Sequence, residues 1–213
     1  MTDPFSTARV QAAYDAAAED YQRAFGHDLA RLPLDRRMLD RARHAAVDGP
    51  TLDLGCGTGS AGSYLAAQGA RVVGLDLSGG MLRACRSTGE FPVCRGDMRR
   101  LPFADGAFAA VVAYYSLHHI PRAELGTVLA ETARVLRPVG VLLLGTHLGE
   151  GEVYSDAFLG HDIATTGGTL YGAPELTDRV SSAGFVVVAQ DTRAPLAHEH
   201  QTRRIYLLAQ RVA

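Results

Sequence analysis

Short apolar runs alternate with amphipathic segments from residue 51 onward, a pattern that predicts strands alternating with helices. We expect strands in five of these runs: 51–54, 71–76, 91–95, 108–114 and 139–147. We expect helices in the segments between them: 60–68, 79–87 and 121–136. Alternation of this kind is typical of an open, doubly wound α/β sheet with helices on both faces.

The C-terminal part of the chain lacks one helix of this alternation. A helix is predicted over 173–183 and strands over 185–191 and 202–212, with no helical segment between the two strands. Strands joined in this way form a hairpin, so the last strand is expected to run antiparallel to its neighbours.

Before the first strand, residues 6–24 carry apolar and aromatic side chains at helical spacing. Pro33 suits the first turn of a second helix that continues through residue 47. We therefore expect one domain over residues 1–213. It would consist of a helical cap or lid over 1–48 and a sheet core over 49–213, with an insertion near 147–172.

Composition sets limits on the function. A chain of 213 residues with 47% hydrophobic and 21% charged residues can bury a substantial core. Its net charge of −2 offers no basic field to a nucleic acid, and it has no apolar run long enough to span a membrane. The polar, acidic start from Met1 to Pro4 is unlike a signal peptide, and three unpatterned cysteines suit a reducing cytoplasm.

The chain contains no lysine, because all 21 of its Lys and Arg residues are arginine. Dehydrogenases with a Tyr-x-x-x-Lys motif, Schiff-base enzymes and P-loop kinases all need a lysine, so these classes are excluded. Arginine in place of lysine, with many alanines and valines, is typical of a GC-rich bacterial genome.

The turn after the run at 51–54 is the most informative local pattern. Asp53 stands just before three alternating glycines, Gly55, Gly57 and Gly59. Glycines at this spacing permit a sharp strand-to-helix turn and a close approach of the backbone to a ligand. The free N–H groups of the following helix suit an anionic group. Ser60 stands where a dinucleotide-binding turn has its third glycine, which argues against NAD.

Two further acidic residues follow the next two predicted strands. Asp76 lies 17 residues after Gly59, close to the place where a nucleotide-binding unit positions an acid on the ribose hydroxyls. Asp97 follows the third strand. Because the carboxyl ends of parallel strands meet at one edge of a sheet, we expect these groups to gather there around one ligand.

These motifs resemble those of class I S-adenosylmethionine (SAM) dependent methyltransferases, of the small type 11/25 group that modifies metabolites. The resemblance covers essentially the whole chain, and 108–120 is similar to the family's fourth strand and its loop. It implies a seven-stranded Rossmann-like sheet in the order 3-2-1-4-5-7-6 with strand 7 antiparallel. The family usually has Gly-Gly before its fifth strand, and Val139 departs from that pattern, which affects turn geometry rather than chemistry.

The resemblance also implies SAM as cofactor and S-adenosylhomocysteine (SAH) as product. The turn from Asp53 to Gly59 would hold the methionine part, Asp76 the ribose hydroxyls, and Asp97 with Met98 the adenine. The full set expected at the cofactor is Tyr14, Tyr21, Asp53, Gly55, Cys56, Gly57, Gly59, Asp76, Leu77, Met81, Asp97, Met98 and Tyr114. No metal is expected, since the metal-dependent catechol-type enzymes use a lysine that this chain lacks.

Methyl transfer requires an aligned acceptor, exclusion of water and, for a protonated acceptor, a base. Tyr14 and Tyr21 share one helix face, and two hypotheses fit them: a lid with catalytic phenols, or aromatic residues that only pack. Tyr115, His118 and His119 follow the fourth strand, where polar side chains are close to a ligand. His119 matches a histidine common in related methyltransferases, and we expect it to line the acceptor wall or act as the base; the alternative is a histidine that only caps its loop.

The insertion supplies further candidates for the substrate wall. His147, His161 and Tyr171 accompany other aromatic residues around Gly167-Gly168, which we interpret as the flexible hinge of a lid. The alternative is that these side chains only pack.

We expect a small-molecule methyltransferase that acts on an oxygen, in a hydroxyl, carboxylate or phosphonate, of a bacterial secondary metabolite. The protein would be cytoplasmic, a monomer or homodimer, without nucleic-acid or membrane partners. If the acceptor is already an anion, no base is needed, and Arg179, Arg203 and Arg204 become candidates to bind it, although arginine is also common on surfaces. N-methylation and a non-catalytic SAM-binding regulatory domain are the alternatives.

Overall fold

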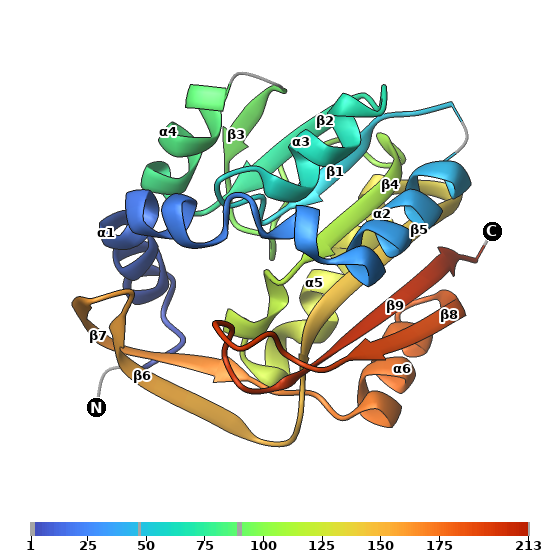
Figure 1. The fold of residues 1–213 in the computed structure, drawn as a ribbon. Helices are drawn as coiled ribbons and strands as arrows, with labels where there is room; N and C mark the ends of the chain where they lie inside the picture. The colour runs from blue at the N-terminus through green and yellow to red at the C-terminus, as the bar shows by residue number, and fades with distance from the viewer. Residues whose placement is uncertain (1–2, 47, 89–90, 213) are drawn as a thin grey trace.

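A sheet of seven strands forms the centre of the computed structural model, which describes residues 3–46, 48–88 and 91–212 (Figure 1). The strands lie in the order β3-β2-β1-β4-β5-β9-β8. Their bounds are β1 Thr51–Leu54, β2 Val72–Asp76, β3 Val93–Arg95, β4 Phe108–Tyr114, β5 Leu136–Leu148, β8 Phe185–Arg193 and β9 Arg203–Arg211.

The strand directions confirm the predicted fold. Strands β1 to β5 pair in parallel, whereas β9 pairs antiparallel with both β5 and β8. The C-terminal hairpin therefore supplies the antiparallel strand, as the missing helix predicts. The main difference in bounds is at β5, which begins at Leu136 because the chain passes directly from the preceding helix into the strand.

Helices cover both faces of the sheet (Figure 1). Their bounds are α1 Thr7–Phe25, α2 Pro33–Ala45, α3 Ser60–Ala67, α4 Gly79–Thr88, α5 Leu125–Val135 and α6 Ala173–Ser182, with short 3₁₀ turns at Asp28–Arg31, Leu117–His119 and Arg122–Glu124. The end of the second predicted helix at residue 47 lies outside the described residues.

Alternate residues of β4 face opposite layers, as the period of a strand requires. Val111 and Ala113 belong to the apolar cluster beneath α5 and α6, whereas Ala110 and Val112 belong to the cluster beneath α2 and α3. The two N-terminal helices lie in different places. Helix α2 covers the sheet itself, and α1 packs against α4 and β7.

The insertion after β5 is a two-stranded hairpin of β6 Glu152–Phe158 and β7 His161–Thr169. The predicted hinge at Gly167-Gly168 is wrong, because both glycines lie within β7 and pair with β6. The Gly167 N–H also donates to the Pro4 carbonyl, at 2.9 Å. A Cβ on Gly167 would lie 2.5 Å from the ring of Phe5, so this glycine permits close packing rather than motion.

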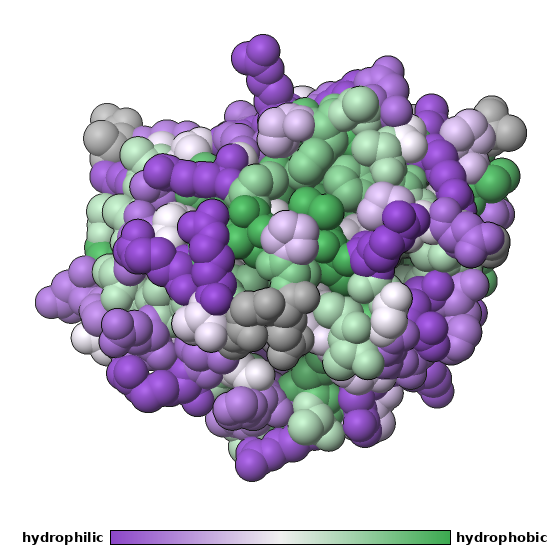
Figure 2. Space-filling view, turned by 90° about the horizontal axis from the view of Figure 1, so that it is seen from above, coloured by the Kyte–Doolittle hydropathy of each residue, from purple (hydrophilic) through white to green (hydrophobic). Residues whose placement is uncertain are grey.

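Figure 2 shows the side of the molecule that lies at the top of Figure 1, where hydrophilic side chains surround an apolar area. Across the described ranges, no helix is both long and apolar enough to cross a membrane. The most exposed large apolar side chains include Val139 and, on the edge strand β8, Val186 and Val188.

Candidate functional site

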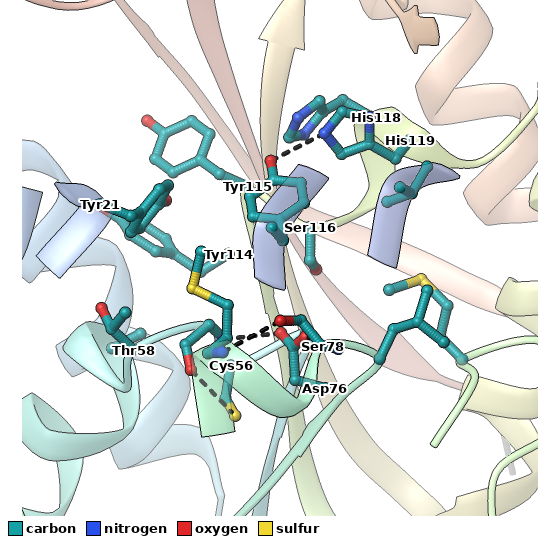
Figure 3. A pocket seen from close by; sticks show the side chains of 18 of the residues that line it. Tyr21, Cys56, Thr58, Asp76, Ser78, Tyr114, Tyr115, Ser116, His118 and His119 are labelled. Carbon is teal, nitrogen blue, oxygen red and sulfur yellow. Dashed lines mark hydrogen bonds between the residues drawn. The ribbon is translucent and has the colours of Figure 1, made fainter. Parts of the chain in front are cut away.

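A cavity of about 290 Å³ lies where the carboxyl ends of β1, β2 and β4 meet beneath α1. Sixteen of the residues expected at the site line it: Tyr14, Tyr21, Asp53, Gly55, Cys56, Gly57, Asp76, Leu77, Met81, Asp97, Met98, Tyr114, Tyr115, His118, His119 and His147. Figure 3 shows His118 and His119 across this pocket from Cys56 and Asp76. The cavity therefore has one side built from the glycine turn and the acids, and another built from histidines.

The three glycines of the turn serve different purposes. All have positive φ values: 72° at Gly55, 54° at Gly57 and 91° at Gly59. A Cβ on Gly55 would lie 2.3 Å from Cβ of Ser116, so protein atoms fill that space. A Cβ on Gly57 would meet no protein atom within 4 Å. The backbone at Gly57 thus borders open space in the cavity, where a ligand can approach it.

Asp53 holds the turn in place from behind. Its carboxylate accepts a hydrogen bond of 2.8 Å from the N–H of Gly62, in the first turn of α3, and the residue is 1% exposed. Burial raises the pKa of Asp53 to about 7, although the Gly62 N–H lowers it. The side chain therefore satisfies one of the free N–H groups at the start of α3.

Asp76 connects the glycine turn to the segment just before α4. One carboxylate oxygen accepts the N–H of Gly57 and the other accepts the N–H of Ser78, both at 2.8 Å. Burial raises the pKa of Asp76, and these N–H groups oppose the shift. Two backbone N–H bonds leave further lone pairs on the carboxylate for ligand hydroxyls.

Helix α1 is anchored by Asp15, for which the sequence suggested no role. Its carboxylate accepts the Ser78 hydroxyl at 2.6 Å and the Gly80 N–H at 2.7 Å. A Cβ on Gly80 would lie 2.9 Å from Cα of Asp15, so the two helices approach closely there. The first turn of α4 therefore binds a carboxylate from the cap, a contact between segments too distant in sequence to predict.

Asp97 and Met98 line the cavity beyond β3. The Asp97 carboxylate accepts the backbone N–H of Arg99 at 2.9 Å and its guanidinium at 2.7 Å. These hydrogen bonds from Arg99 lower the pKa of Asp97, against the opposing effect of burial. The carboxylate is thus ionised and held against the cavity wall.

Tyr14 and His119 meet on the histidine side. The Tyr14 hydroxyl lies 2.8 Å from Nε2 of His119, and Nδ1 lies 2.8 Å from the carbonyl oxygen of Gly167. Burial lowers the pKa of His119, which keeps the ring neutral near pH 7. Phe158 from the hairpin packs against Tyr14 with ring centroids 5.1 Å apart, and it also lines the cavity.

Tyr21 lies beside Tyr14 on the same helix, with ring centroids 6.1 Å apart. Its side chain lines the cavity. Burial raises the pKa of Tyr21 to about 12, with Asp76 and Asp28 adding to the shift. The phenol is therefore neutral and available to a ligand.

His118 and His147 extend the histidine side toward β5. Their rings lie 5.1 Å apart, and burial lowers the pKa of both, that of His147 to about 3. Nδ1 of His118 is buried without a hydrogen-bond partner among the described residues. Among the residues that the structure describes, no three side chains of His, Cys, Asp or Glu are placed to share a metal ion.

A buried polar network behind this wall is absent from the sequence-based expectations. Asp35 of α2 is 0% exposed, and one of its oxygens accepts the hydroxyls of Tyr114 at 2.7 Å, Tyr206 at 2.7 Å and Tyr115 at 3.2 Å. Its other oxygen accepts Nε of Arg193 at 2.9 Å. Tyr115 has a φ of 55°, which is uncommon for a side chain of this size, and the network holds it there.

Four expected site residues do not line the cavity. Gly59 packs behind the turn, where a Cβ would lie 2.6 Å from Sγ of Cys85. His161 pairs with Asp20 at 2.8 Å near the hairpin turn. Tyr171 is 0% exposed in the apolar cluster beneath α5 and α6, and Arg179 of α6 pairs with Glu175 at 2.9 Å.

Comparison with known proteins identifies related sequences. The profile of a family described as "Methyltransferase domain" matches residues 51–140. The malonyl-[acyl-carrier protein] O-methyltransferase of Laribacter hongkongensis is 35% identical over 90% of this chain and 69% of its own length. The demethylmenaquinone methyltransferase of Corynebacterium urealyticum is 38% identical, but over 62% of this chain and 56% of its own length. The chain thus spans between about half and two thirds of these two relatives.

Solved structures share the fold at low sequence identity. The protein PH0226 of Pyrococcus horikoshii has a TM-score of 0.70 at 20% identity, over 90% of this chain and 98% of its own. A Burkholderia thailandensis 1,6-didemethyltoxoflavin-N1-methyltransferase, solved with 1,6-didemethyltoxoflavin and SAH, has a TM-score of 0.69 at 20% identity. That alignment covers 100% of this chain and 92% of the other.

Proposed function

The chain belongs to the class I family of SAM-dependent methyltransferases, and from this premise we propose that it methylates an oxygen atom of a small-molecule acceptor. When bound, SAM supplies an electrophilic methyl group on a sulfonium whose positive charge is consumed in the transfer. The protein must then align the acceptor, exclude water and accept any proton that is released.

The residues on the cofactor side fit SAM. Gly57 borders open space that a Cβ would enter, which allows the methionine part to lie against the turn from Asp53 to Gly59. Asp76 retains lone pairs for two ribose hydroxyls after it has bound the N–H groups of Gly57 and Ser78. We assign the adenine side to Leu77, Met81 and the Asp97-Met98 pair, which complete the same wall.

The contact between Tyr14 and His119 is the observation that supports an oxygen acceptor. His119 is neutral, and its Nε2 accepts a hydrogen bond from the Tyr14 hydroxyl. Tyr14 can therefore take up a proton from an acceptor only as it passes its own proton to His119. An acceptor hydroxyl bound at Tyr14 would lose its proton by this relay as its oxygen bonds to the methyl carbon. Because burial keeps the Tyr14 pKa high, the two transfers are concerted and no free phenolate forms.

One of the two reported relatives supports the proposal of an oxygen acceptor. The Laribacter protein is an O-methyltransferase by its name, while its alignment leaves about a third of its length outside this chain. We further propose that the acceptor is a bacterial secondary metabolite. We also propose that transfer needs no metal, because side chains supply the proton acceptor and the chain lacks the lysine of catechol-type sites.

The test is methyl transfer from radiolabelled SAM to a bacterial metabolite extract. We expect label in a small molecule that carries a new ether or ester, and at least about tenfold less label with the Asp76→Ala variant at subsaturating SAM. Label in an amine would replace the oxygen assignment with N-methylation. SAH binding without any labelled product would contradict catalysis and favour a regulatory SAM-binding domain.

A further inference from the structure

Arg204 lies almost fully buried at the histidine end of the cavity, opposite His147 in the pairing of β5 with β9. Its side chain is only 3% exposed. Tyr115 forms the neighbouring wall, with its ring 5.7 Å from Cζ of Arg204. A charged side chain at such depth is expected to have a hydrogen-bond acceptor for each of its N–H donors. Any donor of Arg204 without an acceptor therefore indicates that a ligand group binds there.

The nearest acidic group is already used. Both oxygens of Glu199 accept the guanidinium of Arg193, at 2.6 and 2.7 Å, and one also accepts the N–H of Leu196 at 2.6 Å. The closest approach of Glu199 to Arg204 is 3.7 Å, from Nη2. The Tyr115 hydroxyl is likewise occupied within the Asp35 network.

Arg204 keeps unused donors. Its Nη1 donates to Thr202 and to the carbonyl of His200. Among the described residues, Nε has no partner and Nη2 makes no hydrogen bond. A guanidinium presents its donors in a planar fork that matches the two oxygens of a carboxylate or a similar anion.

His147 adds a second donor next to Arg204. Its Nδ1 lies 2.6 Å from Oγ1 of Thr202, and that oxygen also accepts Nη1 of Arg204 at 2.9 Å. Because a guanidinium can only donate, the Thr202 oxygen accepts from Arg204, and this makes the Thr202 hydroxyl a better donor toward Nδ1 of His147. Nδ1 then acts as the acceptor, so the ring proton of His147 is on Nε2. His147 and Arg204 both line the cavity, so this end of it offers donors from two neighbouring side chains.

We propose that Arg204 and His147 form a subsite for an anionic oxygen group, of the carboxylate class, on the methyl acceptor. This inference rests on the proposed function and makes it more specific. The acceptor would be a hydroxylated acid, whose acid group binds at Arg204 while its hydroxyl lies at Tyr14. The subsite would select acids over their neutral esters and amides.

The test measures binding without turnover, so its result does not depend on methyl transfer. Wild-type protein saturated with SAH is titrated with benzoate and with benzamide, by calorimetry and by the NMR shifts of the histidine rings. We expect benzoate to bind at least about tenfold more tightly than benzamide, as a charge-assisted hydrogen bond predicts. We also expect it to shift the His147 ring signals.

Variants locate the binding. Arg204→Gln should lose at least about tenfold in benzoate affinity, and His147→Gln should lose less. Arg203→Gln is the matched control, since Arg203 is the neighbouring exposed residue of β9 and bonds Thr192 instead. Arg204→Lys, which keeps the charge, serves if the glutamine variant melts early.

Three results of the benzoate and benzamide titrations would overturn the proposal. They are no benzoate binding at millimolar concentrations, equal binding of benzamide, and equal losses in the Arg203 and Arg204 variants. A selective loss of SAH affinity in Arg204→Gln would also overturn it, because the anion at this end would then be the carboxylate of the cofactor. SAH binding in the wild type is measured separately and tests the cofactor assignment itself.

Discussion

The Tyr14 hydroxyl donates a hydrogen bond to Nε2 of His119 across 2.8 Å, joining helix α1 to the turn after β4. The direction of this hydrogen bond follows from the partner of the other ring nitrogen, Nδ1. Nδ1 lies 2.8 Å from the Gly167 carbonyl, which can only accept, so the ring proton of a neutral His119 is on Nδ1. Helix α1, the turn after β4 and the hairpin therefore meet at one histidine, with its lone pair directed at Tyr14.

This geometry predicts the pH dependence of catalysis. Since burial lowers the pKa of His119, kcat should rise with pH through an apparent pKa below about 6.5 and be flat above it. His119→Ala should lower kcat by about a hundredfold or more, with little change in SAH affinity. The measurement is kcat from pH 5 to 9 for the wild type and the variant.

Two variants separate a base from a wall residue. Tyr14→Phe removes the relay but keeps the ring, and it should lose a similar factor in kcat. His161→Ala is the control, because His161 pairs with Asp20 of α1 outside the cavity. A raised KM with an unchanged pH profile in His119→Ala would show that His119 only lines the wall.

Gly57 offers a test of the cofactor cradle. Gly57→Ala should abolish or strongly weaken SAH binding, because its Cβ would enter the cavity. Gly69→Ala is matched to it: Gly69 also has a positive φ, of 84°, and no protein atom lies within 4 Å of its added Cβ, but it is outside the cavity. Equal SAH affinities in the two variants, by calorimetry, would show that Gly57 serves only the turn.

Asp76 should contribute to binding in two ways. Asp76→Ala removes acceptors for the ribose and also releases the N–H groups of Gly57 and Ser78 that shape the wall. Each charge-assisted hydrogen bond contributes about 1.5–3 kcal/mol, so SAH binding should weaken at least tenfold while the fold survives. Asp105→Ala, at an 81% exposed side chain, is the control. Wild-type SAH affinity in Asp76→Ala would remove this assignment.

The sheet and the glycine turn after β1 could be predicted because their signals are local. The spacing of the glycines after Asp53, and apolar runs that end in acids, fix a strand-turn-helix order without any knowledge of distant contacts. The hairpin was missed as strands because its residues do not alternate clearly between apolar and polar. Its glycines indicated a hinge, yet Gly167 only makes room for Phe5.

Distant contacts explain what the sequence could not provide. Asp35 meets Arg193 across 158 positions, and nothing near either residue indicates the partner. The same limit misplaced Tyr171, since an aromatic residue beside a cavity wall and one buried under α6 look alike in sequence. Arg204 is the opposite case: in the sequence it looks like a surface arginine, but the pairing of β5 with β9 places it in a buried position.

His147 predicts how stability depends on pH. Its folded pKa is about 3, whereas a histidine in the unfolded chain titrates near 6.5. Between these values the unfolded chain binds more protons, so stability should fall as the pH is lowered through this window, by up to about 1.4 kcal/mol per pH unit from this group. Chemical denaturation of the wild type and His147→Gln from pH 4 to 7 measures it. The variant should show a shallower slope than the wild type, and equal slopes in the two proteins would contradict the buried neutral state.

Val139 carries a backbone strain that a glycine would relieve. Its φ is 56° although it is β-branched, and its side chain is 56% exposed, so little apolar burial depends on it. A left-handed conformation costs an ordinary side chain about 1–2 kcal/mol, while glycine costs about 0.5–1 kcal/mol in unfolded-state entropy. Val139→Gly should therefore stabilise the protein by about 0.5–1 kcal/mol, or about 1–4 °C in Tm for a chain of this size.

The control for this change is Val186→Gly. Val186 is 57% exposed on the edge strand β8, and it is not among the described residues with positive φ. Glycine there loses strand propensity and gains no relief, so this variant should be less stable than the wild type. Calorimetric unfolding of both variants should move Tm in opposite directions. A fall in Tm for Val139→Gly comparable with that of Val186→Gly would show that the start of β5 stores no strain at this residue.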